Sequence, residues 1–149
     1  MAVKPIPQGY RSVTPYFVVE NAQKFVDFIT RAFDAKQQTR FDMPDGSIAH
    51  AEFLIGDSRI MVGQANQQWK PTTCALHLYT KDADTVYRKA LDAGATSTMA
   101  LEDKFYGDRS GAVRDQFGNQ WTIATHKEDV SNEELKRRMK AMFKQPATT

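Results

Sequence analysis

Apolar residues alternate with polar ones along some stretches of the chain and recur every three to four positions along others. Alternating stretches rich in β-branched and aromatic residues predict strands, and in the first half these cover residues 12–19, 36–43, 48–55 and 58–64. Apolar residues at helical spacing follow Asn21, a good N-cap, and predict a helix over 22–33. The first half therefore reads β-α-β-β-β.

The second half has the same order of elements. Strands are predicted over residues 72–80, 95–101, 111–115 and 120–126, with a polar loop between the middle two. A helix over 83–93 begins after Asp82 and stops at Gly94. Ser131 and Glu134 form a capping box that opens a further helix over about 131–143.

A single shift of 61 residues superposes the two halves. It places Thr14 on Ala75, Asn21 on Asp82, Ala51 on Ala112 and Met61 on Thr122. Few residues are identical, but the order of elements, the caps and the apolar positions are kept. We therefore expect one α+β domain over residues 1–149, built from two βαβββ modules (about 11–65 and about 71–127) and a C-terminal helix.

Composition and charge narrow the class of protein. A chain of 149 residues, 41% hydrophobic and 26% charged, suits a single folded domain. No apolar run reaches the roughly 20 residues of a membrane span, and the N-terminus lacks the core of a signal peptide. The one cysteine, Cys74, has no partner for an internal disulfide. A formal charge of +2 does not favour binding to nucleic acid. From these features together we expect a cytoplasmic protein that binds neither nucleic acid nor membrane.

Several short motifs carry a resemblance to a known family. They are TPY (14–16), HAE (50–52), IGDS (55–58), YGDRSG (106–111), DQFGNQW (115–121) and IATH (123–126). Through them the chain resembles the vicinal oxygen chelate superfamily, which includes glyoxalase I, bleomycin-resistance proteins and extradiol dioxygenases, and within it the PhnB-like branch. The resemblance implies paired modules whose sheets curl around a cupped, barrel-like cavity, and a homodimer.

Metal-dependent members of that superfamily hold a divalent ion through four side chains on the first and last strands of each module. The matching positions here are Thr14, Met61, Ala75 and Thr122. Hydroxyl and methyl groups are poor ligands, and a thioether suits soft metals. We therefore expect no metal cofactor at the superfamily's usual position.

Strand alternation predicts which side chains face the cavity, because residues i and i+2 share a face. Together with the superfamily positions and a loop arginine, it gives ten expected ligand-binding residues: Thr14, Tyr16, His50, Glu52, Met61, Ala75, His77, Tyr79, Arg109 and Thr122. Arg109 is expected either to clamp a carboxylate or phosphate or to pair with Asp103, Asp108 or Asp115. Trp121 and Cys74 are expected in the core, His126 at the surface, and Trp69 at the rim of the cavity.

His50 and Glu52 are the candidates for chemistry. An imidazole near a carboxylate can act as a general acid or base, or the pair can bind a ligand without reacting, or serve structure alone. A displaced metal site at His50, Glu52 and His77 is a further alternative. The sequence thus predicts a protein that binds a small organic ligand without the usual metal; the alternative is a lyase, isomerase or dioxygenase-type enzyme, and whether the protein is an enzyme stays open.

Overall fold

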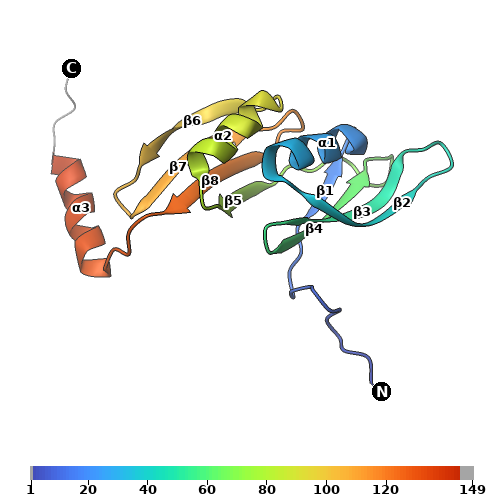
Figure 1. Ribbon diagram of the computed structural model, residues 1–149, viewed down its shortest axis with the longest axis horizontal. Helices are drawn as coiled ribbons and strands as arrows, with labels where there is room; N and C mark the ends of the chain where they lie inside the picture. The colour runs from blue at the N-terminus through green and yellow to red at the C-terminus, as the bar shows by residue number, and fades with distance from the viewer. Residues whose placement is uncertain (1, 145–149) are drawn as a thin grey trace.

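Two four-stranded sheets, each covered on one face by a helix, form the body of the molecule in the computed structural model, which describes residues 2–144 (Figure 1). The first module comprises β1 (Tyr16–Val19), α1 (Ala22–Phe33), β2 (Lys36–Asp42), β3 (Ile48–Ile55) and β4 (Ser58–Gln64). Its strand order is β1-β4-β3-β2, with β1 parallel to β4 and the other pairs antiparallel.

The second module repeats this arrangement and is followed by a helix. It comprises β5 (Ala75–Tyr79), α2 (Ala83–Asp92), β6 (Thr96–Asp103), β7 (Asp108–Arg114) and β8 (Gln120–His126), in the order β5-β8-β7-β6; α3 (Asn132–Lys144) follows. The expected α+β fold of two βαβββ modules and a C-terminal helix is confirmed. Over residues 2–144, however, both sheets stay open at their edges, and no closed barrel forms.

The internal duplication is visible in the strand register. Tyr16 pairs with Met61 in the first sheet and His77 with Thr122 in the second, so each partner is displaced by 61 residues. The third strands differ from the expected offset, because Met61 lies opposite Glu52 whereas Thr122 lies opposite Ala112. From Ala112 to its partner Thr122 the chain is one residue longer than from Glu52 to Met61. The offset along the third strands is therefore 60, and Ala51 corresponds to Gly111 rather than to Ala112.

The core lies between the sheets and the two helices, and it joins the modules. Asn21 and Asp82 cap α1 and α2 by accepting from backbone N–H groups three residues on. The indole of Trp121 is 2% exposed and stacks on Phe17 of the first module, with ring centroids 5.6 Å apart. Its Nε1 donates to buried Asp115. Trp121 therefore packs in the core, as expected.

Some boundaries differ from those expected. β1 begins only at Tyr16, because Pro15 has no N–H for a ladder bond. The expected loop over 102–110 is mostly strand: β6 reaches Asp103 and β7 starts at Asp108, joined by a tight turn in which Gly107 has φ +103°. Within residues 2–144 no helix is long and apolar enough to cross a membrane.

Candidate functional site

The face of the first sheet that points away from α1 carries most of the candidate residues. Along β3 burial alternates: Ala51, Phe53 and Ile55 are buried under α1, and the side chains of His50 and Glu52 lie on the other face. The register sets Glu52 beside Met61 and Met61 beside Tyr16. We call this surface the open face of the first sheet.

The imidazole of His50 is held from both sides. Its Nδ1 lies 3.0 Å from the hydroxyl of Tyr16, and its Nε2 lies 3.2 Å from a carboxylate oxygen of Glu52. An ionised carboxylate only accepts, so Nε2 carries a proton, and in the neutral ring Nδ1 accepts from the tyrosine hydroxyl. Residues two apart on a strand are about 7 Å apart at the backbone, but the imidazole ring spans that gap. Tyr16, His50 and Glu52 thus form one connected relay.

Glu52 stays charged in this setting. Its pKa lies below the ordinary value, chiefly because the neighbouring Tyr10 hydroxyl donates to it, and His50 and Arg59 act in the same direction. A guanidinium nitrogen of Arg59 is 3.5 Å from the second carboxylate oxygen, and the guanidinium lies 4.6 Å from the centre of the Tyr10 ring. The N-terminal segment and β4 therefore fix the carboxylate that orients His50.

A hollow of about 160 Å³ lies next to the relay. It is lined by Tyr16, Val18, Ala49, Gly63, Gln64, Asn66 and Trp69. Trp69 is 57% exposed, and its ring centre is 5.9 Å from that of Tyr16. At Gly63 a Cβ would lie 2.9 Å from the Tyr16 hydroxyl, so glycine lets this hydroxyl sit against the strand. Trp69 lies at the rim of this hollow, as expected of a residue between the modules.

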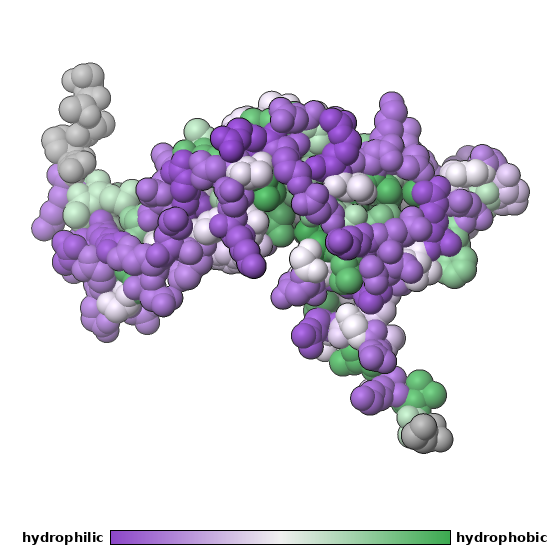
Figure 2. All heavy atoms as spheres, viewed as in Figure 1, coloured by the Kyte–Doolittle hydropathy of each residue, from purple (hydrophilic) through white to green (hydrophobic). Residues whose placement is uncertain are grey.

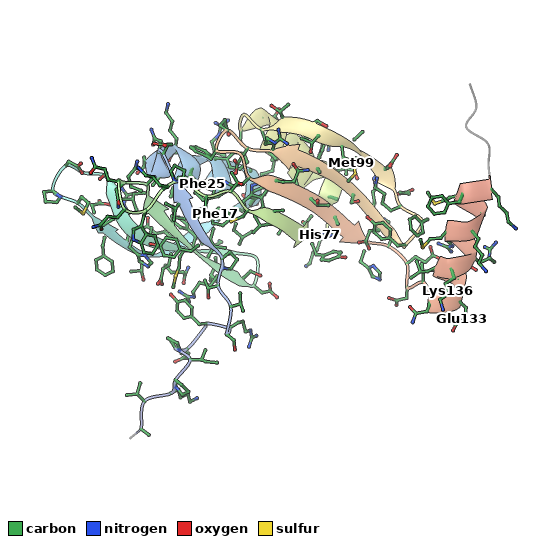
Figure 3. All side chains as sticks on the ribbon, turned by 180° about the vertical axis from the view of Figure 1, so that it is seen from behind. Phe17, Phe25, His77, Met99, Glu133 and Lys136 are labelled. Carbon is green, nitrogen blue, oxygen red and sulfur yellow. The ribbon has the colours of Figure 1, made fainter. Side chains whose placement is uncertain are left out.

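The other expected cavity residues do not join this relay. Thr14 precedes β1 and lines a separate hollow of about 210 Å³ that includes Arg59. His77 and Tyr79 lie on the open face of the second sheet, ring against ring at 4.8 Å, and Figure 3 shows His77 projecting from the side opposite α2. Ala75 and Thr122 lie on that same face. A single chain thus divides the expected residues between the two sheets, with Thr14 just before the first strand.

Arg109 is placed differently from the expected ligand clamp. It lies in β7, not in a loop, and its side chain points towards α2. Two of its nitrogens contact the carboxylate of Asp84 at 2.7 and 2.9 Å, and a third is 3.3 Å from Asp103. The ion-pair alternative therefore describes Arg109. Its main partner is Asp84, which opens α2 and was not among the expected acids.

A second polar network lies at the far end of the second sheet. Asp108, 3% exposed, accepts from the hydroxyl of Tyr79 and from Nδ1 of His126, both at 2.8 Å. The other nitrogen of His126 is 2.8 Å from Asp129. The hydrogen bonds that His126 donates to Asp108 and Asp129 raise the pKa of His126, and the one that Tyr79 donates to Asp108 raises the pKa of Tyr79. His126 is a surface residue, as expected, that ties β8 to the segment before α3.

The superfamily's metal position does not fit a divalent cation here. A methyl group, a thioether and two hydroxyls, from Ala75, Met61, Thr14 and Thr122, make a poor donor set. The displaced alternative also lacks a preformed site, since His77 lies on the other sheet from His50 and Glu52. Across residues 2–144 no three His, Cys, Asp or Glu side chains are grouped to hold a metal.

Sequence reasoning missed Tyr10, Arg59 and Gly63. Tyr10 directly follows Gly9 in an arm that also contains Pro5 and Pro7, and only tertiary contact brings it to Glu52. Arg59 follows the alternation of β4, two residues before Met61, and that spacing was the available signal. Gly63 gave no signal beyond being a glycine inside a strand.

Comparison with known proteins places this geometry in a family. A model of the Glyoxalase/Bleomycin resistance protein/Dioxygenase superfamily matches residues 12–123. An uncharacterized protein of Mycobacterium bovis is 33% identical over 139 residues, covering 86% of this chain and 91% of that protein. One from Mycobacterium tuberculosis is also 33% identical over 139 residues, covering 86% and 82%.

Solved structures show the same fold at low identity. TioX from Micromonospora sp. ML1 has a TM-score of 0.68 and 24% identity, covering 78% of this chain and 99% of that one. The PhnB protein from Bacillus cereus has a TM-score of 0.59 and 19% identity, covering 77% of this chain and 99% of that one. The fosfomycin resistance protein FosX from Mesorhizobium loti has a TM-score of 0.58 and 16% identity, covering 83% of this chain and 95% of that one. The chain has two βαβββ modules, and the family model matches it over residues 12–123. The chain therefore belongs to the Glyoxalase/Bleomycin resistance protein/Dioxygenase superfamily.

Proposed function

We propose that the protein binds a small organic molecule in the hollow on the open face of the first sheet, as a PhnB-like member of its superfamily that does not use the usual divalent cation. The observation that carries this proposal is the Tyr16–His50–Glu52 relay beside a hollow with an exposed tryptophan at its rim. Sites for small molecules combine apolar walls with a few fixed polar groups. The hollow has both.

The chemistry of the lining indicates what kind of molecule would fit. The rings of Tyr16 and Trp69 offer flat apolar surface, and Gln64 and Asn66 add polar side chains to the lining. His50 lies behind this lining and holds the Tyr16 hydroxyl, which can still accept a hydrogen bond from a ligand. The charge of Glu52 is matched by Arg59 and Tyr10, so it orients His50 more than it attracts a cation. We therefore propose a ligand that has a flat apolar part and several hydrogen-bonding groups.

We further propose that a second copy of the chain completes the site in a homodimer. The hollow in one chain, about 160 Å³, is smaller than the roughly 300–1,000 Å³ of common ligand sites. The open faces also leave Phe41, Trp69 and Tyr79 more than half exposed. Apolar surface of this kind favours a partner, and a two-fold partner would cover both sheets at once.

Acid–base catalysis is the second candidate function, and one observation favours it. His50 is oriented by a carboxylate on one nitrogen while its other nitrogen meets a hydroxyl, the arrangement in which imidazole serves as a general base. A lyase or isomerase that moves a proton through Tyr16 and His50 would use it. Turnover of a bound molecule, lost in His50→Gln with binding kept, distinguishes this candidate from a binding protein.

The test is a ligand screen by thermal shift, run with EDTA and again with Mn²⁺, Ni²⁺, Zn²⁺ or Fe²⁺ added, beside metal analysis of protein purified without chelator. A bound ligand raises the melting temperature by mass action. We expect hits that are unchanged by EDTA, and well under one equivalent of metal. Stoichiometric metal, or hits that require it, would contradict the metal-free proposal.

A further inference from the structure

Among residues 2–144, the C-terminal helix α3 has an apolar face on which no other segment packs. None of its residues is buried, and its contact with the body runs through Arg138, which donates to the carbonyl of Phe105 and pairs with Glu128 at 2.8 Å. Elsewhere on the helix Met139, Met142 and Phe143 are 43%, 56% and 84% exposed. A helix of 13 residues is marginal in water without packing, so this face calls for a partner.

Lysines border the apolar face of α3. Lys136, Lys140 and Lys144 follow one another at four-residue spacing, and with Met139 and Phe143 they line one shallow groove. Figure 2 shows apolar atoms over α3, at one end of the molecule, within an otherwise hydrophilic surface. The partner of this groove should therefore present apolar side chains together with negative charge.

The β2–β3 hairpin presents that combination. Phe41 and Met43 are 62% and 51% exposed, and Asp42 and Asp45 lie beside them. Residues 41–47 contain no lysine or arginine. Asp42 is paired with Arg40 at 2.7 Å, whereas Asp45 is bonded only to Ser47 among the described residues and keeps its charge available.

α3 and this hairpin cannot meet within one chain, because they lie at opposite ends of the longest axis (Figure 1). A second copy turned about a two-fold axis perpendicular to the longest axis has its α3 end next to the hairpin end of the first copy, and its hairpin end next to α3 of the first copy. Two different patches then meet twice, and the assembly closes as a dimer. The same rotation brings the open face of the first sheet of one copy towards that of the second sheet of the other.

We propose that α3 of each chain packs its Met139 and Phe143 groove on the Phe41 and Met43 side of the β2–β3 hairpin of a second copy, with the lysines facing Asp45. This deepens the homodimer proposed above and rests on it. α3 then acts as a clamp on the outer edge of the partner's first sheet. It closes that side of the partner's ligand site, which is the side farthest from the partner's second module.

Cross-linking tests the contact directly. In a Cys74→Ser background, protein with Met43→Cys is mixed with protein carrying Phe143→Cys and oxidised. We expect a disulfide-linked dimer from the mixture. Ala141→Cys, on the opposite side of α3, is the matched control and should give little of it. Because all three positions are exposed, the variants should fold normally.

Dimer affinity gives the second readout, by sedimentation of the full chain. Phe143→Asp should weaken the dimer about tenfold or more, as for an apolar anchor at an interface. Lys140→Glu and Asp45→Lys should each weaken it about two- to fivefold and restore it when both are present in the same chain. A monomeric wild-type protein would overturn the dimer and the clamp together. A dimer with neither the Met43–Phe143 link nor any response to Phe143→Asp would overturn the clamp alone.

Discussion

The two modules differ on their open faces far more than in their cores. Where the first sheet carries His50, Glu52 and Met61, the register places Ser110, Ala112 and Thr122 in the second. The relay beside the hollow has no counterpart there. The second module instead keeps its polar network at the end of the sheet, where Asp108 joins Tyr79 and His126.

The positions facing the helices have been kept apolar in both modules. Phe53 corresponds to Val113 and Val62 to Ile123, and all four are at most 2% exposed. A packed core restricts change to apolar side chains around which the neighbouring residues can repack. The side chains of the open faces are not held between sheet and helix, so the copies could diverge there, and the binding surface that we propose lies on the first sheet.

The largest loss of stability is expected from a substitution in the core, compared with one on the open face of the same strand. Phe53→Ala removes a ring that is 2% exposed beneath α1 and should lower the free energy of unfolding by about 3–5 kcal/mol. His50→Ala, three residues earlier on the other face of β3, should change it by no more than about 1 kcal/mol. Urea denaturation of both variants measures this. A silent Phe53→Ala with an unfolded His50→Ala would mean that the assignment of faces is inverted.

A smaller effect on stability, through the titration of His126, tests whether the polar network of the second module is structural. Asp108 and then Asp129 raise the pKa of His126 above its ordinary 6.5, so the folded state binds this proton more tightly than the unfolded state. The resulting stabilisation is fully present below about pH 6.5 and is lost as the pH rises through the raised pKa. Melting temperatures followed from pH 6 to 9 should fall more in the wild type than in His126→Gln. Equal slopes in the two proteins would contradict this role.

Much of the fold could be predicted, because the signals that carried it are local. Asn21 and Asp82 cap helices through their own neighbours, and the alternation of β3 runs through consecutive residues from His50 to Ile55. The same alternation put His50 and Glu52 on the face away from the core. These predictions needed no knowledge of what lies across the sheet.

What the sequence could not provide depends on contacts between distant segments. Arg109 pairs with Asp84, 25 residues earlier, because α2 packs over β7, and only the fold brings them together. Tyr10 reaches Glu52 from an arm without regular structure. The division of the candidate residues between two sheets likewise follows from how the modules sit side by side, which no local pattern encodes.

The central claim is that the ligand site belongs to the first sheet, and calorimetric titration of a screen hit in the presence of EDTA tests it most directly. His50→Ala removes the centre of the relay, and His77→Ala is the matched change on the open face of the second sheet. We predict that His50→Ala weakens binding about tenfold or more, because the Tyr16 hydroxyl loses the partner that holds it beside the hollow, while His77→Ala has a smaller effect. Binding that survives His50→Ala and is lost in His77→Ala would contradict it.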